Sequence, residues 1–377
     1  MTGGGAAGSY AIGDTYFNIQ NVVGSSFDDI FYASAATGAA ANKFDGGVSD
    51  ANSHNRVSYE ATSTGIIVNL AGTAVTVNGT SIAANSGAGG ALGDTYANIQ
   101  DITGGSGADI IVANLAANNI NGGTGTNNTV HYGGSGAGVI VNLSGASVTI
   151  GATTVASMTG ANATASASHA AGDTYTAIQN VTGSTFNDIF IGGAEVNAFT
   201  GNGGSDTVSY AASGSAVTVN LSTGPVTPTA GGGSLAAGTG RGGDAQGDTY
   251  NGISNVTGST FGGDEFFAHN TLVGTFDGNG GLHDRVNYTG FSSNLTINLS
   301  DKTVGGLNAG KGIVGKTGQD TYIGIHDATG GSGNDTFIAG SAANAFDGGT
   351  GSNTVSYAAS DACLLYTSPS PRDQRGS

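Results

Sequence analysis

The chain has 377 residues, of which 70 are glycine, none is tryptophan and only 9% are charged. A single large globular core is not expected, because glycine at this density loses too much backbone entropy unless the fold uses it repeatedly at special turns; four prolines without a strict G-x-y period exclude collagen. The formal net charge of −17 would repel phosphate backbones and anionic membrane surfaces, so nucleic acid is not an expected partner.

The acidic residues are biased toward aspartate, with 23 Asp against Glu60, Glu195 and Glu265. Helix surfaces use glutamate freely, whereas aspartate is typical of turns and of oxygen-ligand cation sites. No apolar run predicts a membrane-spanning segment, and the N-terminus lacks the basic and apolar regions of a signal peptide. The chain opens within a repeat and some secretion routes read a C-terminal signal, so this does not argue for the cytosol.

A long repeat, marked by the motif DTY, runs along the chain. Its aspartates are Asp14, Asp94, Asp173, Asp248 and Asp320, at spacings of 80, 79, 75 and 72 residues. The spacing predicts one elongated domain over residues 1–361, built of five modules at about 13–92, 93–171, 172–246, 247–318 and a truncated 319–361. Each module continues with an I-x-x-V-like step and ends in V-S-Y and V-N-L phrases.

A shorter period of nine residues lies inside each module. The third module runs GSTFNDIFI, GGAEVNAFT and GNGGSDTVS from Gly183, Gly192 and Gly201; the second and fifth modules repeat this from Gly104 and Gly330. Position 6 is Asp or Asn and position 8 is apolar, with a one-residue slip near Asn128 and insertions around Asp50 and Gly262. Six residues of turn and three of strand predict a half coil whose position 8 side chain points inward.

These nonapeptides resemble the repeats-in-toxin (RTX), or hemolysin-type, calcium-binding repeat GGxGxDxUx, which is a known β-helix repeat. The resemblance spans residues 10 to 361 and is strongest in GGSGADII from Gly104 and GGSGNDTF from Gly330. It implies an all-β, right-handed parallel β-solenoid or β-roll with nonapeptide turns, an extracellular location, type I secretion, and adhesin or toxin roles for large members. The family's usual Glu after the Ile is replaced here by Gln20, Gln100, Gln179, Ser254 and His326.

The 18-residue coil places pairs of turn residues one above the other, about 4.8 Å apart. Asp188 then stacks on Asp206, and two carboxylates at that distance repel by about 1 kcal/mol in water and about 3 kcal/mol at an effective dielectric near 20. A cation relieves the repulsion, and the flexible carboxylate and carbonyl oxygens of glycine-rich turns suit Ca²⁺ better than Mg²⁺. The predicted calcium-binding residues are Asp188, Asp206, Asp109, Asp335, Asn353, Asn127, Asp29, Asp264, Asp284, Asp320, Gly104, Gly330, Gly183 and Gly201.

The opposite edge of the coil carries neutral residues at position 6, namely Asn42, Asn118, Asn197 and Asn344. Asparagine tolerates left-handed turn geometry and can hydrogen-bond along a ladder. We therefore expect ions on one edge only, near one site per module. The alternative for any isolated Asp is a turn former that hydrogen-bonds its own backbone.

The remaining candidates for chemistry favour structure over catalysis. Phe190, Phe199 and Val208 occupy position 8 and are expected in the core, and a stacked ladder of tyrosines is expected from the V-S-Y phrases. Six histidines show no metal spacing, and no GxSxG elbow occurs. No catalytic residue is predicted, and the chain is not expected to be an enzyme by itself.

From about Ala362 the sequence departs from the repeat. The stretch to residue 377 contains Cys363, the only cysteine, and two of the four prolines, and it resembles a translated sequencing adaptor. We exclude it from the fold, and expect the natural protein to continue beyond residue 361.

Three functions remain open at this stage. The first is a secreted, calcium-responsive repeat region with an adhesin or toxin type of role and a cell-surface or polysaccharide partner left open. The second is the accessory repeat region of an extracellular protease, lipase or polysaccharide-modifying enzyme whose catalytic domain lies elsewhere. The third is a solenoid adhesin whose degenerate turns no longer bind calcium.

Overall fold

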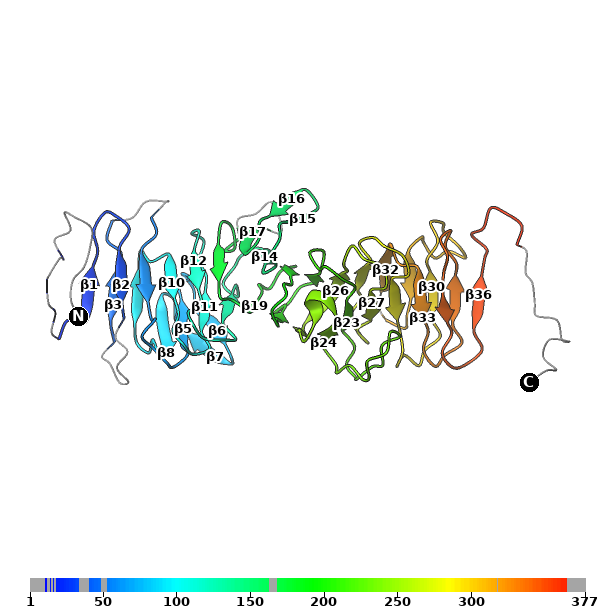
Figure 1. Ribbon diagram of the computed structural model, residues 1–377, viewed down its shortest axis with the longest axis horizontal. Coiled ribbons are helices and arrows are strands. Elements are labelled where there is room, and N and C mark those ends of the chain that lie inside the picture. Colours follow the sequence, from blue (N-terminus) through cyan, green and yellow to red (C-terminus); the bar gives the residue numbers. More distant parts are fainter. Residues whose placement is uncertain are drawn as a thin grey trace.

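The apolar residues that recur every nine positions line the inside of a solenoid made of two long sheets (Figure 1). The computed structural model describes residues 18–33, 41–48, 53–162, 168–316 and 318–364, together with Ala11, Asp14 and Tyr16. Throughout this part of the chain the fold is all-β with mainly parallel strands, as predicted, and its one helical element is a 3-10 turn, η1 (Gly243–Ala245). It contains no helix long and apolar enough to cross a membrane. The strands stack along the long axis, with β1 and β36 at opposite ends.

The short strands follow from alternation of β-branched, aromatic and small polar residues between glycine-rich turns. One sheet has the order β1 (Asn21–Val23), β3 (Lys43–Asp45), β9 (Thr95–Ala97), β8 (Ser86–Gly89), β5 (Ile66–Asn69), β11 (Ile110–Val112), β13 (Thr129–His131), β19 (Asn180–Thr182), β21 (Ala198–Thr200), β25 (Thr249–Asn251), β24 (Thr239–Arg241), β23 (Thr218–Asn220), β27 (Glu265–Phe267), β29 (Arg285–Asn287), β33 (Asp327–Thr329) and β35 (Phe346–Asp347). The other has the order β2 (Ile30–Tyr32), β4 (Arg56–Ser58), β10 (Asp101–Thr103), β12 (Asn119–Asn121), β18 (Thr174–Thr176), β17 (Thr159–Asn162), β14 (Val139–Asn142), β20 (Ile189–Ile191), β22 (Asp206–Ser209), β26 (Ile253–Thr257), β28 (Thr275–Asp277), β32 (Gln319–Ile323), β31 (Lys311–Ile313), β30 (Thr296–Asn298), β34 (Thr336–Ile338) and β36 (Thr354–Ser356).

The register of the parallel strands shows the coil length directly. Ile189 pairs with Thr207, and Thr336 pairs with Thr354, so these coils have the predicted 18 residues. The coil between β11 and β13 is one residue longer, because Ile110 pairs with Thr129. This extra residue changes which side chain completes the turn above Asp109.

The core consists of the inward side chains of both sheets. Phe190 and Phe199 are buried as predicted, and their rings stack across the two sheets with centroids 5.7 Å apart. Full burial of a side chain of this size contributes about 1.5–3 kcal/mol. Val208 and Phe337 are also buried, whereas Val355 in the last coil is 43% exposed because β36 is an edge strand of its sheet.

Each of the four complete modules also inserts an antiparallel strand that the nonapeptide pattern does not predict. After β5 the chain leaves the coil, returns as antiparallel β8, and then places the DTY strand β9 between β8 and β3. In space the order is thus β3, β9, β8, β5, although β5 precedes β9 in the chain. The same arrangement recurs around β17, β24 and β31, in alternating sheets.

The segment that leaves the coil folds back over the outer face of the solenoid. Between β5 and β8 it forms the hairpin β6 (Val75–Val77) and β7 (Thr80–Ile82), whose Val75 packs with Val112 of β11. Between β14 and β17 it forms β15 (Val148–Ile150) and β16 (Thr153–Val155), whose Val148 packs with Ile191 of β20. These hairpins bury apolar residues that point away from the core.

At each module junction the two residues that face each other across neighbouring strands change together. Arg56 lies opposite Asp101 and Arg285 opposite Asp327, with Nη2 to Oδ2 distances of 3.6 and 3.3 Å. At the two inner junctions the corresponding pairs are Thr129 with Asn180 and Thr207 with Asn255. Each junction therefore contains either two charged or two neutral partners.

A double-mutant cycle on Arg285→Thr and Asp327→Asn should give a coupling energy of about 1 kcal/mol, because opposite charges directly across two strands stabilise by about that much and this pair is largely buried. Urea unfolding measures it. The control cycle, Thr207→Ala with Asn255→Ala at a neutral junction, should give a coupling close to zero. Equal coupling at both junctions would contradict the interpretation.

Candidate metal centre

Turn aspartates and asparagines form ladders along both edges of the solenoid, where the strands of each sheet begin. Asp109 precedes β11 of one sheet and Asp188 precedes β20 of the other, so the prediction of charged turns on one edge only is wrong. The Ile66 N–H donates to Asp109 Oδ1 at 2.8 Å, and the Asp109 N–H donates to Asn128 Oδ1 at 2.9 Å. The same donation to the next coil joins Asp188 to Asp206, Asp264 to Asp284, Asp335 to Asn353 and Asp29 to Asn55. Either a carboxylate or an amide oxygen can make this contact, so the ladder itself does not require charge.

The predicted partner of Asp109, Asn127, is wrong by one residue. The 19-residue coil places Asn128 in the ladder, buried, while Asn127 lies in the preceding turn with a positive φ of 64°. The predicted pairs Asp188 with Asp206 and Asp335 with Asn353 do lie in adjacent coils.

The second oxygen of most of these aspartates is held by its own turn. Asp109 Oδ2 accepts the Gly105 N–H at 2.7 Å, and Asp188 Oδ2 accepts the Ser184 N–H at 2.7 Å. Asp264, Asp335 and Asp29 accept equivalent N–H groups of Ser259, Gly331 and Ser25. Two or more donors therefore satisfy each of these carboxylates.

Asp206 and Asp284 are different, because the Oδ2 atom of each is buried without a hydrogen-bond partner. A methyl group on Gly201 would contact Asp206 Oδ2 and lie 2.8 Å from the Gly252 carbonyl oxygen. A methyl group on Gly278 would lie 2.6 Å from Asp284 Oδ2 and 2.7 Å from the Gly324 carbonyl oxygen. In both turns a carboxylate oxygen and a carbonyl oxygen of the next coil converge beside the first glycine.

Where position 6 is asparagine, its side-chain amide donates a hydrogen bond to the equivalent carbonyl oxygen of the next coil. Asn128 Nδ2 donates to the Ala177 carbonyl oxygen at 3.0 Å, and Asn55 Nδ2 donates to the Asn98 carbonyl oxygen at 3.0 Å. In the Asp206 and Asp284 turns two oxygens face each other instead. A proton or a cation between them would relieve this arrangement, because an unpaired buried carboxylate oxygen is strongly destabilising.

Burial controls the ionisation of these carboxyls. It raises the pKa of Asp206 and Asp284 to about 7 each, with a further increase from the neighbouring Asp188 and Asp264 carboxylates. It raises the pKa of Asp188 and Asp264 to about 6, against the hydrogen bonds that favour their charged forms. Near neutral pH a proton and a cation therefore compete for the same two places.

Comparison with known families supports the prediction from the motifs. The family model described as RTX calcium-binding nonapeptide repeat (4 copies) matches residues 98–128, 179–212 and 327–355. These three segments carry RTX calcium-binding repeats. The matched segments include Asp109, Asp188, Asp206, Asp335 and Asn353, whereas Asp264 and Asp284 lie outside them. No curated protein matches the chain.

The RTX turns fit calcium through oxygen atoms from two sources. Among the described residues no three His, Cys, Asp or Glu side chains come together as a metal-binding group. An ion in an RTX turn of this chain would therefore rely on one or two carboxylates and on backbone carbonyls, a hard and flexible donor set that suits Ca²⁺. The orphaned oxygens of Asp206 and Asp284, each beside a carbonyl oxygen, meet this requirement.

The first glycines of the RTX turns are required by this arrangement. A Cβ on Gly104, Gly183 or Gly330 would contact Oδ2 of the turn aspartate and lie 2.8 Å from the carbonyl oxygen of the next coil. Gly201 meets the same two kinds of atom. The four predicted glycines therefore lie beside the predicted carboxylates. Because glycine has no Cβ, the carboxylate and carbonyl oxygens can occupy the space next to each of them.

Asp320, although predicted as a ligand, lies in a different environment. Its Oδ2 accepts the Tyr288 Oη–H at 2.8 Å and the buried Lys316 Nζ at 2.7 Å, and its Oδ1 accepts the Gly274 N–H. An ammonium group already neutralises this carboxylate. We therefore leave Asp320 out of the calcium proposal below.

The DTY aspartates form a buried network that sequence reasoning missed. Asp173 Oδ2 accepts the Tyr132 Oη–H at 2.7 Å, and Tyr132 Oη lies 2.5 Å from Tyr175 Oη. The same three-residue network recurs at Asp94, Asp248 and Asp320. The predicted tyrosine ladder is thus wrong, since each V-S-Y tyrosine pairs with a DTY tyrosine. The repeated pairing of DTY with V-S-Y in the sequence was the available signal.

The half-coil asparagines do not form one neutral edge, because Asn118 precedes β12 in the sheet of β20 whereas Asn197 precedes β21 in the sheet of β11. The Asn118 N–H donates to Asp173 Oδ1 at 2.9 Å, and the Asn197 N–H donates to Asp248 Oδ1 at 2.7 Å. Burial raises the pKa of Asp173 to about 8 and that of Asp248 to about 7. Both the turn aspartates and the DTY aspartates therefore occur on both edges, and those of the DTY motif are closed by tyrosine hydroxyls.

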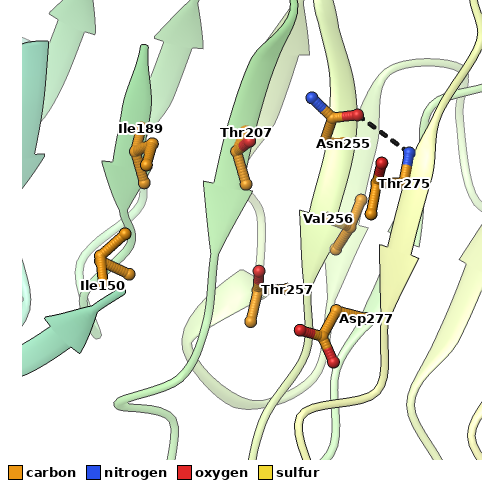
Figure 2. Close-up of a pocket in the computed structure, with 8 residues that line it drawn as sticks. All are labelled: Ile150, Ile189, Thr207, Asn255, Val256, Thr257, Thr275 and Asp277. Carbon is orange, nitrogen blue, oxygen red and sulfur yellow. Dashed lines mark hydrogen bonds between the residues drawn. The ribbon is translucent and has the colours of Figure 1, made fainter. Parts of the chain in front are cut away.

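A shallow hollow of about 260 Å³ lies on the outer face beside the β15 and β16 hairpin (Figure 2). Figure 2 shows Thr207, Asn255 and Thr275 on neighbouring strands, with Asn255 Oδ1 accepting the Thr275 N–H at 2.9 Å. Asp277 is the one titratable residue among its lining residues, and its Oδ1 accepts the Asn279 N–H. The hollow has no second acid, base or nucleophile beside this carboxylate.

Proposed function

We propose that this chain is a calcium-responsive repeat region of a secreted protein, in which Ca²⁺ stabilises the folded solenoid. The observation that carries the proposal is the pair of orphaned carboxylate oxygens, Asp206 Oδ2 and Asp284 Oδ2, each facing a carbonyl oxygen of the next coil. RTX repeats are calcium-binding motifs, and the family is typically secreted. An adhesin or toxin type of role and export by type I secretion belong to the same proposal.

Asp206 and the Gly252 carbonyl would hold one ion, and Asp284 and the Gly324 carbonyl would hold another. Bound calcium supplies positive charge, which favours the ionised form of both carboxyls. An ion bound only by the folded chain stabilises it by RT ln(1 + [L]/Kd), about 1.4 kcal/mol for each site at 10 mM calcium and an affinity of about 10⁻³ M. Folding would then follow the higher calcium concentration outside the cell.

The test is the double variant Asp206→Asn with Asp284→Asn. The new amides can donate to the Gly252 and Gly324 carbonyl oxygens, as Asn128 and Asn55 do in their turns. We expect the metal-free variant to be at least as stable as the natural sequence and to lose most of the increase in Tm that calcium gives. Circular dichroism during a calcium titration at pH 7.5 measures both quantities.

Asp109→Asn serves as the matched control. Both Asp109 oxygens accept N–H groups, so an amide there would face the Gly105 N–H and destabilise the protein by about 1–3 kcal/mol with or without calcium. A chelator that changes neither the spectrum nor the Tm of the natural sequence would refute the proposal. It would favour the calcium-independent solenoid.

We also propose that the chain has no catalytic activity of its own. The hollow of Figure 2 supports this, because Asp277 is the one titratable group in its lining. An accessory role beside a catalytic domain is compatible with the same calcium chemistry. We expect the isolated chain to show no turnover in assays for protease, lipase and polysaccharide lyase or hydrolase activity.

A further inference from the structure

The outward side of β2 differs from its four counterparts in the later modules. The counterparts, β11, β20, β27 and β34, each follow the turn aspartate and end in an outward apolar residue. That residue is Val112, Ile191, Phe267 or Ile338, with an exposed fraction of 0, 0, 0 and 3%. In β2 the same position is Tyr32, which is 56% exposed, and its neighbour Ile30 is 53% exposed.

In three of these four later modules the preceding module covers this position. Val75 and Val77 of the β6 and β7 hairpin pack with Val112, Val148 and Val155 pack with Ile191, and Val226 and Leu235 pack with Phe267. The V-N-L strand that leads into each of these segments pairs with the covered strand: β5 with β11, β14 with β20, and β23 with β27. One preceding unit thus supplies both a strand and an apolar cover.

The hydrogen bonds of the turn aspartate give independent evidence that β2 lacks, among the described residues, the neighbouring V-N-L strand that its counterparts have. Asp109, Asp188, Asp264 and Asp335 each accept an N–H from the first residue of the preceding V-N-L strand or from the residue just before it, at 2.7–2.9 Å. For Asp29 the donors within the described residues are the Ser25 N–H and hydroxyl of its own turn. The strand β2 is also an end strand in the described order of its sheet.

We infer that the outer face of β2, and its edge that pairs with no strand among the described residues, form a docking surface for the V-N-L strand and apolar hairpin of a repeat module joined upstream in the same polypeptide. The strand would pair with β2 and donate an N–H to Asp29, and the hairpin would cover Ile30 and Tyr32. The occupant is identified by the three counterparts in which such a strand and its cover meet the equivalent residues.

The inference is tested by supplying that unit from the chain itself. Residues 129–171, which contain β14 and the β15 and β16 hairpin, are copied and joined directly before Gly13 in place of residues 1–12. A second extended protein carries residues 207–246 in the same position. Tyr32→Cys is then introduced in a Cys363→Ser background. The rate at which the thiol at position 32 is labelled, with and without each extension, measures how far the added unit covers this position.

At least one extension should slow labelling of the cysteine at position 32 by tenfold or more. Phe27→Cys is the matched control, because Phe27 is 79% exposed and its counterparts Phe186 and Phe261 remain 46 and 49% exposed where a hairpin is present; its rate should change less than twofold. Val148→Asp with Val155→Asp in the copied hairpin should restore fast labelling.

Unchanged labelling at position 32 in both extended proteins would overturn the inference. Concentration-dependent protection in the unextended protein, with formation of a dimer, would assign the surface to a second copy and would likewise overturn it. Protection in an extended protein that remains monomeric supports it.

Discussion

Asp320→Ala is expected to destabilise the protein by about 3–5 kcal/mol, because it leaves the Lys316 ammonium buried without its carboxylate. The surroundings of Lys316 are apolar, with the Tyr288 and Phe291 ring centroids 5.8 and 5.6 Å from Nζ. The Tyr288 hydroxyl and the Gly274 N–H also lose their acceptor. Because repeat proteins can unfold in parts, amide hydrogen exchange of β30 to β34 is the preferred measurement.

The double variant Asp320→Ala with Lys316→Met should recover about 2 kcal/mol, since it removes the buried unpaired charge. Lys316→Met alone should cost less than Asp320→Ala, because Asp173 and Asp248 form the same tyrosine network with no ammonium contact of this kind. If Lys316→Met is as damaging as Asp320→Ala, the ion pair itself, and not the unpaired lysine, determines the stability of this module.

Metal-free protein is expected to lose stability as the pH rises from 5 to 8.5. Burial raises the pKa of six carboxyls from near 4 to between about 6 and 8, namely Asp173, Asp188, Asp206, Asp248, Asp264 and Asp284. In that range the folded chain binds more protons than the unfolded chain. Their stabilising effect is therefore complete below pH 4 and is lost as the pH passes through the folded-state pKa values, by at most about 1.4 kcal/mol per pH unit for each group.

Urea unfolding in the presence of a chelator measures this pH dependence. Calcium should reduce the slope, because it favours the charged forms of Asp206 and Asp284 in place of the proton. The Asp206→Asn and Asp284→Asn variant should reduce the slope in the chelator as well. Stability that rises with pH in the chelator would show that these carboxyls are ionised in the folded chain.

The sequence predicts the coil but not the hairpins. The inward orientation of position 8 residues such as Phe190 can be predicted from the local sequence, because an apolar side chain between glycine-rich turns must point inward. The inserted strands lack the nine-residue period. A signal was nevertheless present in VTVNGTSI, where Asn78 and Gly79 adopt positive φ values of 49° and 77°, as the two-residue turns of hairpins require.

The candidate site was predicted to the level of residue type and turn, but not of atoms. Asp188 and Asp206 lie in adjacent coils as the 18-residue spacing indicated. Which carboxylate oxygen remains without a donor could not be predicted, because it depends on whether a backbone N–H of the turn reaches it, as the Ser184 N–H reaches Asp188 Oδ2 and none reaches Asp206 Oδ2. Asn127 was chosen in place of Asn128 because one extra residue in a turn is invisible to a fixed period.

The DTY strand β9 lies between two strands that both precede it in the chain, β3 and β8. This order determines how many residues must be available before the solenoid can lengthen. Because β9 lies between β3 and β8, a gap next to β3 stays open until about 50 further residues are available. A chain that becomes available gradually from one end cannot form one coil at a time, since loop closure over that span must come first. The solenoid should therefore lengthen by whole modules, and a truncated module would remain an unfinished end.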